Sequence, residues 1–578
     1  MTMKRRNFLK KIGFAAGAPI AFHGVPLQLL AGNNDLQRLA QQSTNDRVLI
    51  IMQMHGGNDG LNTVIPISNY DEYYSRRANI AIPHKVGNRT LIPLDSTVAS
   101  QEQVGLHPDM NDFKHMYDVG KAAVFQGVSY ENNNGSHFRG RDIWFMGGGA
   151  NDYYSSGWVG RYLGTEYAPL SYPDDFPRDE MPDPLALEMG NDVSLLFHQT
   201  GNIPTSISLG NSPEGLLNRI NGLDGFNEET GDNFTVDDRG LPPDFLTNSP
   251  YGREMDWILG LEDKSEEYIK RLAEIYESAS DTSVTYPSNY PFNAPQGAKT
   301  NGLRNQLALI ARLLAGGIQT KVFLVKIGGF DTHADQVESY DPTMGSHAAL
   351  LYHISSAMRA FQSDLQSRGL EDRVLTMTMS EFGRRIGSNG SYGSDHGTGG
   401  PMMMFGKGVK PGIYGVNPDM SRSNVGLQFD YRQIVANVLN EWMGVEKSVL
   451  SAGIDNGIFT EDFIDGPNPQ GGNYEPMNLI KEVILSEKEH IKKNYRIEAV
   501  YPNPASKYTQ AKIFVNNYQE VVVQLINVEG VTVSQIKRSV APGDHTFSFV
   551  LDGLSPGYYF IKAKSQMLND TKRLIIRK

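Results

Sequence analysis

The chain contains no cysteine among its 578 residues. Thiolate nucleophiles, cysteine-ligated zinc and disulfides are therefore excluded, and any bound metal must use aspartate, glutamate, histidine or main-chain oxygen. An excess of positive charge is also missing, because the formal net charge is −12. Phosphate neutralisation requires a basic surface, so this charge argues against a nucleic-acid partner.

A long uninterrupted apolar run is missing too, even at the N-terminus. Residues 1–32 combine a basic start, a mildly apolar stretch from Ile12 that glycine and proline interrupt, and a small-residue exit near Ala31. A membrane span needs about 20 apolar residues, so we predict a signal peptide over 1–32 and no stable transmembrane span. The pair Arg5 and Arg6, followed by NFLK, resembles the twin-arginine signal of folded exported proteins. An ordinary secretory signal with two arginines is the alternative.

The C-terminal part of the chain has a different composition. A linker rich in glycine, proline and asparagine, followed by a charged helical segment, is predicted over 466–496. Short alternating strands with regularly spaced turn residues then fill 497–578, which favours a small all-β, Ig-like sandwich.

Three stretches of this sandwich, YPNPA, GYYFIKA and KRLIIRK, resemble the C-terminal sorting domain of the type IX secretion system of Bacteroidetes. Together with the N-terminal signal, the resemblance implies the twin-arginine and type IX export machineries as partners, with passage through the periplasm to the cell surface or the medium. An Ig-like carbohydrate or adhesion module is the alternative interpretation.

Residues 45–465 form the body of the chain, in which strands alternate with helices. Near-continuous apolar runs predict strands buried on both faces, at 47–54, 121–128, 321–327 and 373–379. Helical periodicity lies between them, so we predict a doubly wound, mostly parallel α/β sheet. The loop-rich residues 181–295 are predicted to be an insertion.

Polar clusters follow the four strands, at the end where open α/β sheets bind ligands. They contain His55 and Asp59; Ser136, His137, Arg139 and Asp142; Asp331, His333 and Asp335; and Glu381, Arg384 and Arg385, shortly before Asp395 and His396. The density of oxygen and imidazole ligands at 331–335 favours a divalent metal. Local roles stay open for three residues: an Asx turn at Asp59, a helix N-cap at Ser136 and an arginine salt bridge at Glu381.

Five motifs in the body resemble the domain of unknown function 1501 (DUF1501) family over about 47–445: GGNDGLN, SHFRGRDIW, GFDTHADQ, SEFGRR and DHGTGGPMMMFGKGVKPGIYG. That family is related to the alkaline phosphatase and sulfatase superfamily. The resemblance implies an alkaline-phosphatase-like domain over 45–465. Carried over by order along the chain, it implies Ser136 as nucleophile and metal ligands at Asp59, Asp331, His333 or Asp335, Glu381 and His396.

The implied activity is hydrolysis of phosphate or sulfate esters, of a small molecule or a polysaccharide, with a divalent metal such as Zn, Ca, Mg or Mn. Arg139 and Arg384 are candidates to fork onto the non-bridging ester oxygens. Asp395 is expected to orient His396 rather than to bind metal. A non-catalytic cell-surface protein that binds, for example, polysaccharide on the same fold is the alternative, with its aromatic residues stacking on sugars.

Overall fold

The computed structural model describes residues 46–481 and 495–577, apart from 169, 179–180, 191–192, 202, 210–266, 517, 528–530 and 566–568. Before residue 46 it describes only β1 (Ala21–Phe22) and β2 (Val25–Pro26), which pair antiparallel. The predicted signal peptide and the charged linker helix therefore lie largely outside the described residues. The chain divides into two compact units, one over 43–481 and one that contains 495–577. Within the described residues, no helix is long and apolar enough to cross a membrane.

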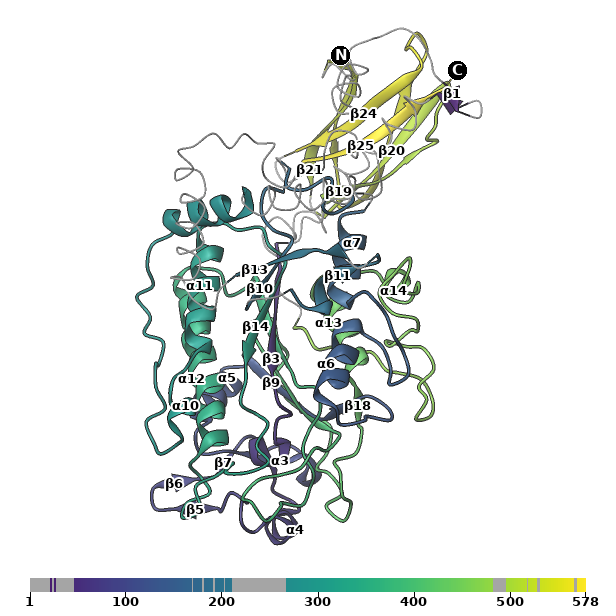
Figure 1. Ribbon diagram of the computed structural model, residues 1–578. Coiled ribbons are helices and arrows are strands. Elements are labelled where there is room, and N and C mark those ends of the chain that lie inside the picture. The colour runs from purple at the N-terminus through teal and green to yellow at the C-terminus, as the bar shows by residue number, and fades with distance from the viewer. Residues whose placement is uncertain are drawn as a thin grey trace, which may run out of the picture. The chain divides into compact units, whose positions relative to one another are not determined.

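A nine-stranded sheet organises the first unit (Figure 1). Eight strands follow one another in the order β13, β10, β14, β3, β15, β16, β9, β17, and β18 pairs with β9. Their bounds in this order are Ser206–Leu209, Ala186–Met189, Val322–Ile327, Val48–Met54, Val374–Met379, Gly400–Phe405, Ala122–Ser129, Gly412–Tyr414 and, for β18, Phe429–Asp430. β16 runs antiparallel to β15 and β9, and all other pairs are parallel. The predicted mostly parallel sheet is confirmed, and β3, β9, β14 and β15 end at the same edge.

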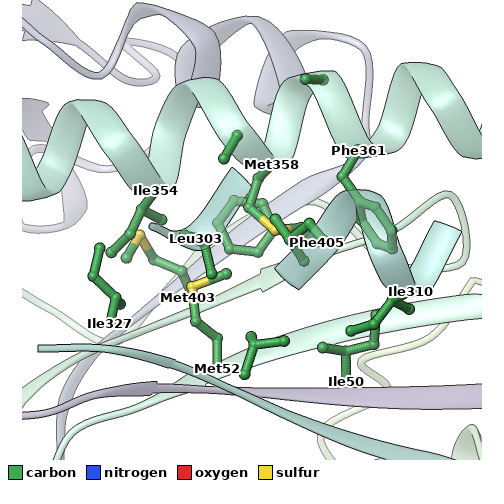
Figure 2. Packing of buried hydrophobic residues seen from close by; sticks show 14 of the residues in the cluster. Ile50, Met52, Leu303, Ile310, Ile327, Ile354, Met358, Phe361, Met403 and Phe405 are labelled. Carbon is green, nitrogen blue, oxygen red and sulfur yellow. The ribbon is translucent and has the colours of Figure 1, made fainter. Parts of the chain in front are cut away.

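Helices cover both faces of the sheet, as expected for strands that are apolar throughout. α11 (Leu303–Ala315) and α12 (Ser346–Ser367) lie on one face, while α6 (His137–Met146) and α13 (Tyr431–Glu441) lie on the other (Figure 1). Figure 2 shows α11 and α12 packing through Ile310 and Met358 onto the sheet that carries Met52. All seven residues of β3 are buried, which explains why it carries no alternating polar face.

Shorter elements complete the first unit. The helices are α3 (Gly60–Thr63), α4 (Tyr70–Arg76), α5 (Asn111–Asp118), α7 (Trp158–Glu166), α10 (Gln296–Lys299), α14 (Lys447–Leu450) and the 3-10 turns η1 (Ser100–Glu102) and η2 (Leu195–Phe197). The strands are β4 (Val64–Pro66), β5 (Lys85–Val86), β6 (Arg89–Thr90), β7 (Ile92–Pro93), β8 (Val104–Leu106), β11 (His198–Gln199) and β12 (Ile203–Pro204).

The segment 181–295 differs from its prediction as a loop-rich insertion, because it supplies two strands of the main sheet. β10 pairs with β14, and β13 pairs with β10 at the edge. Both strands have only four residues, ALEM and SISL, so neither gives the long apolar run by which the other strands are found.

The second unit consists of two antiparallel sheets. β19 (Tyr495–Tyr501), β20 (Tyr508–Val515) and β23 (Gly543–Val550) form one sheet. β22 (Thr532–Val540), β21 (Gln519–Asn527), β24 (Gly557–Lys564) and β25 (Asn569–Ile576) form the other. Alternate side chains from both sheets share one apolar core that includes Ile513, Val523 and Ile561. The predicted Ig-like sandwich is confirmed.

Candidate metal centre

Three ionisable side chains from different loops meet at the carboxyl edge of the sheet. They are His137 at the start of α6, Asp331 after β14 and His396 before β16. One ligand atom from each lies within 4.8 Å of the other two. Nε2 of His137 is 3.5 Å from Oδ2 of Asp331, and Nε2 of His396 is 3.4 Å from Oδ1 of the same carboxylate. Both imidazoles thus direct the same ring nitrogen at one carboxylate.

The other ring nitrogen of each histidine is engaged by a group that only accepts hydrogen bonds. Nδ1 of His137 lies 2.8 Å from Oε1 of the buried Glu381, and Nδ1 of His396 lies 2.7 Å from the carbonyl oxygen of Gly135. In each neutral ring Nδ1 therefore carries the proton, which leaves a lone pair on Nε2. This arrangement is the one that orients histidine ligands in metal sites.

Two buried polar atoms near the centre lack a hydrogen-bond partner among the described residues. They are Nε2 of His137 and Oε2 of Glu381. Burying polar atoms without a hydrogen-bond partner costs free energy, so these two atoms indicate that a further group binds beside them. Two neutral imidazoles and a carboxylate form a donor set that suits a divalent transition metal or zinc, so the residues present fit such an ion.

Asp331 is held in its ionised form by its neighbours. Nη2 of Arg384 donates to Oδ1 of Asp331 at 2.6 Å, and Nδ1 of His333 lies 2.8 Å from the same oxygen. Burial raises the pKa of Asp331, but Arg384, His333 and His137 outweigh it and lower this pKa to about 2. Burial lowers the pKa of His396, which keeps that imidazole neutral near pH 7. Both groups are in the protonation state that a metal requires.

Arg384 has no exposed side-chain surface and ties the loops of the centre together. Besides Asp331 it donates to four main-chain carbonyls, those of Gly57 (2.8 Å), Ser394 (2.8 Å), Phe330 (3.0 Å) and Gly56. These hydrogen bonds use the N–H groups of the guanidinium, so Arg384 is not free to bind the oxygens of a substrate. The geometry gives Arg384 a positioning role in place of the predicted one.

Backbone segments approach so closely here that side chains are excluded at some positions. Gly56 has a φ of +122°, and a Cβ added to it would lie 2.3 Å from the main-chain nitrogen of Asp331. A Cβ on Gly393 would lie 2.3 Å from the carbonyl oxygen of His333. The glycines of HGGNDG and of the loop before His396 therefore allow three loops to pack main chain against main chain.

Asp59, predicted as a metal ligand, lies in a separate buried network. It forms an ion pair with Arg77 and accepts a hydrogen bond from Nε2 of Gln336 at 2.5 Å. Burial raises the pKa of Asp59, but Arg77, His347, Arg384 and the hydrogen bond from Gln336 together outweigh it, so the net shift is downward. Asp59 is thus enclosed with its charge balanced by Arg77, and it is not a member of the triad.

Ser136 and Arg139, the other predicted catalytic residues, lie in the first turn of α6. Ser136 is the N-cap, and its hydroxyl accepts the Arg139 N–H at 3.4 Å, which agrees with the N-cap alternative. The Arg139 guanidinium donates to the carbonyls of Ala150 (2.9 Å) and Asp152 and lies 3.9 Å from the ring centre of Tyr153. Arg139 thus fastens the loop after α6 to that helix.

The remaining predicted residues lie around the triad with different contacts. Asp335 is exposed, has a positive φ of 50° and is not a member of the triad. Glu381 contacts His137 instead of forming a salt bridge with Arg384 or Arg385. The expectation that Asp395 orients His396 is wrong, because Asp395 accepts from Asn389 (3.1 Å) and the carbonyl of Gly135 takes the orienting role.

His137 is the triad member that the predicted ligand set lacks. The sequence places His137 in the polar cluster after the second strand. In that cluster the family resemblance assigns a role only to the neighbouring Ser136, as nucleophile. A histidine at the first position of a helix that follows a buried strand end is the signal that identifies it.

The fold and the site define an α/β protein with a histidine–carboxylate centre, joined to a β-sandwich. Residues 266–457 match the model of the family described as "Protein of unknown function (DUF1501)", and residues 499–577 match that of the "Secretion system C-terminal sorting domain". Both resemblances are thereby confirmed, although the DUF1501 match is shorter than the motifs indicated. Part of the first unit thus matches the DUF1501 model, and the second unit matches the model of the sorting domain.

Comparison with curated proteins gives no match. Among solved structures, the chain is similar to an alkaline phosphatase superfamily protein from Vibrio parahaemolyticus (9% identity, 89% of this chain and 86% of that one, TM-score 0.31). It is also similar to a sulfatase from Pseudoalteromonas sp. (10%, 91% and 87%, 0.31) and to the phosphonate monoester hydrolase of Agrobacterium radiobacter (10%, 87% and 89%, 0.26).

Proposed function

We propose that this protein is an exported, metal-dependent hydrolase of phosphate or sulfate esters. The observation that carries the proposal is the triad of His137, Asp331 and His396, in which both imidazoles have Nδ1 occupied and Nε2 directed at the same carboxylate. A divalent cation held there would supply Lewis acidity and lower the pKa of an attacking hydroxyl or water. Glu381 and Gly135 fix the tautomers that this binding needs.

The start of α6 favours an anionic ester at the same place. His137 is the first residue of this helix, so the first-turn N–H groups and the positive end of the helix dipole lie beside the triad. Negative charge is stabilised at such a helix start. A phosphate or sulfate ester is therefore a better match to the site than a neutral ester.

Ser136 is the proposed nucleophile. Its hydroxyl caps the helix one residue before His137 and has only a long hydrogen bond from the Arg139 N–H. Its oxygen would attack phosphorus or sulfur as its proton leaves to solvent, and the bond to the alcohol oxygen would break. His333, whose side chain is 45% exposed beside Asp331, would protonate that leaving oxygen. Water then releases phosphate or sulfate and restores the hydroxyl.

The test uses the full exported chain. Metal content is measured by mass spectrometry after incubation with zinc, manganese, magnesium or calcium, and turnover is assayed on 4-nitrophenyl phosphate, 4-nitrophenyl sulfate and a phosphonate monoester. We expect about one cation per chain, loss of turnover on chelation and a decrease in kcat of about 10³ or more in Ser136→Ala. His137→Gln should lose the cation, whereas the matched control His115→Gln, exposed on α5, should keep it.

Three outcomes contradict parts of this proposal. Absence of bound metal under all four incubations refutes the metal centre. Metal without turnover on any ester refutes the hydrolase and favours the binding-protein alternative. Turnover that persists in Ser136→Ala removes this serine from the reaction.

The sorting domain supports export as part of the proposal. We propose type IX secretion to the cell surface or medium after twin-arginine passage into the periplasm. Deletion of 497–578 should leave the protein in the periplasm in cell fractionation, and Arg5→Lys with Arg6→Lys should leave it in the cytoplasm. Secretion of the first variant contradicts the role of the sandwich, and export of the second contradicts the twin-arginine route.

A further inference from the structure

Two aromatic side chains attached to the first turn of α6 are unusually exposed. Tyr153 is 81% exposed and Phe138 is 75% exposed, the two highest values for large apolar side chains among the described residues. Exposing rings of this size forgoes the free energy that their burial would contribute. Isolated exposed apolar residues are ordinary, but here the two lie next to one functional element.

Both rings are attached to the first turn of α6, the helix that begins with the proposed metal ligand His137. Phe138 is the second residue of this helix. The ring of Tyr153 lies 3.9 Å from the guanidinium of Arg139, the third residue. The two rings thus flank the helix start that carries His137.

The loop that carries Tyr153 is fastened, so its ring has a defined position. Arg139 donates to the carbonyls of Ala150 and Asp152, and the carboxylate of Asp152 accepts the N–H of Gly149 at 2.7 Å. A ring that is fixed before binding loses little conformational freedom on contact with a ligand.

The polar groups around the rings indicate what covers them. Arg141 and Asp142 lie three and four positions after Phe138 and therefore on the same helix face. The Arg141 guanidinium is 5.8 Å from the centre of the Phe138 ring and 3.4 Å from the carboxylate of Asp142, which is 42% exposed. Flat apolar rings edged by a donor and an acceptor suit a sugar ring, whose faces are apolar and whose edges carry hydroxyls.

We propose that Phe138 and Tyr153 form a stacking surface for pyranose rings of a polysaccharide that carries sparse phosphate or sulfate esters. This inference rests on the proposed function, since it names the substrate class of the same centre. The net charge of −12 opposes a densely anionic polymer, so isolated ester groups on a largely neutral chain fit better. The carboxylate of Asp142 beside the rings opposes insertion into a lipid bilayer.

Binding by the full chain is measured by calorimetry with three probes: a low-sulfate agar galactan, a yeast phosphomannan and potato amylopectin. Heparin and phosphatidylcholine/phosphatidylglycerol vesicles serve as comparators. We expect at least one of the three polymers to bind more tightly than heparin and the vesicles. The double variant Phe138→Ala/Tyr153→Ala should weaken that binding by about tenfold or more. Tyr518→Ala, at 72% exposure in the sorting domain, is the matched control and should not change it.

Kinetics separate this inference from the proposed function. If esters are hydrolysed, the double variant should lose at least about tenfold more kcat/KM on the polymer than on the 4-nitrophenyl ester. Equal losses on both substrates overturn the stacking surface while leaving the hydrolase intact. If no ester is hydrolysed, the proposed function fails and the binding measurement still decides the inference. No binding to any of the three polymers, tighter binding of heparin or vesicles, or an equal effect of Tyr518→Ala overturns it.

Discussion

Asp59 and Asp331 follow neighbouring strands of the same sheet, β3 and β14, yet they have opposite surroundings. Asp59 is buried against the guanidinium of Arg77, and its side chain is 1% exposed. Asp331 is 49% exposed and faces two imidazole lone pairs. Each carboxylate also pairs with a buried arginine, Arg77 for Asp59 and Arg384 for Asp331, so an arginine partner does not decide the role. The difference is that Asp331 is half exposed and has imidazole nitrogens directed at it, whereas Asp59 is enclosed.

The largest effect is expected when the arginine that pairs with Asp59 is removed. Arg77→Met leaves a buried carboxylate without its cation, which should lower the free energy of unfolding by about 3–5 kcal/mol in denaturant titrations. Asp59→Asn combined with Arg77→Met should recover part of the loss. The exposed neighbour Arg76→Met is the control, with an effect within about 0.5 kcal/mol. Equal losses for Arg76 and Arg77 would show that the buried pair is not what stabilises this region.

Replacing each of the two aspartates by asparagine in turn distinguishes their roles. Asp331→Asn should weaken metal binding by about 100-fold or more, because an amide oxygen replaces the charged ligand. Asp59→Asn should lower stability but leave the cation content per folded molecule unchanged. Calorimetric titration of metal into both variants measures the difference, and a comparable loss of affinity in Asp59→Asn would return this residue to the ligand set.

A smaller effect is expected from the residue that orients His137. Glu381→Gln keeps the size of the side chain but weakens its hold on the Nδ1 proton, so metal affinity should decrease by about 10–100-fold. Glu338→Gln, in the loop of Asp331 but not a member of the triad, is the control. Unchanged affinity in Glu381→Gln would mean that His137 does not need this carboxylate.

The smallest effect concerns pH and the network around Asp59. Burial, together with Arg77 and Arg384, lowers the pKa of His347 to about 4 despite the charge of Asp59. As pH falls, His347 is therefore protonated in the unfolded chain before it is protonated in the folded protein. The free energy of unfolding thus decreases below about pH 6.5, by about 1.4 kcal/mol at about pH 5.5. His347→Gln should show a flatter dependence between pH 7.5 and 5.5 than the wild type and His115→Gln. Parallel curves for all three proteins would contradict this.

Much of the fold could be predicted from the sequence, because the central strands are long apolar runs. β3, β9, β14 and β15 stand out in this way and set the edge at which the site lies. β10 and β13 could not be found, since four residues carry too little pattern and their place depends on pairing with β14. A long apolar run in the sequence predicts a strand that is buried throughout. A short strand depends on its pairing with a neighbouring strand, which the sequence pattern does not show.

The site was predictable only as a group of loops. Asp331 and His396 lie in predicted clusters, but the contact of His137 with Glu381 joins residues 244 positions apart. No sequence spacing indicates that contact, nor that Arg77 would reach Asp59 from α4's end. The contacts that side chains make in three dimensions separate ligands from structural residues here.

The hydrogen bonds of Arg384 bear on whether the proposed centre forms before or after a metal ion binds. Its partners are Asp331, the imidazole of His333 and the carbonyls of neighbouring loops, all within the chain itself. The side chains of the proposed centre are thus held together by the chain's own hydrogen bonds. Under the proposed function, metal uptake would follow folding, and the ion in the centre would be set by the compartment that the folded protein reaches.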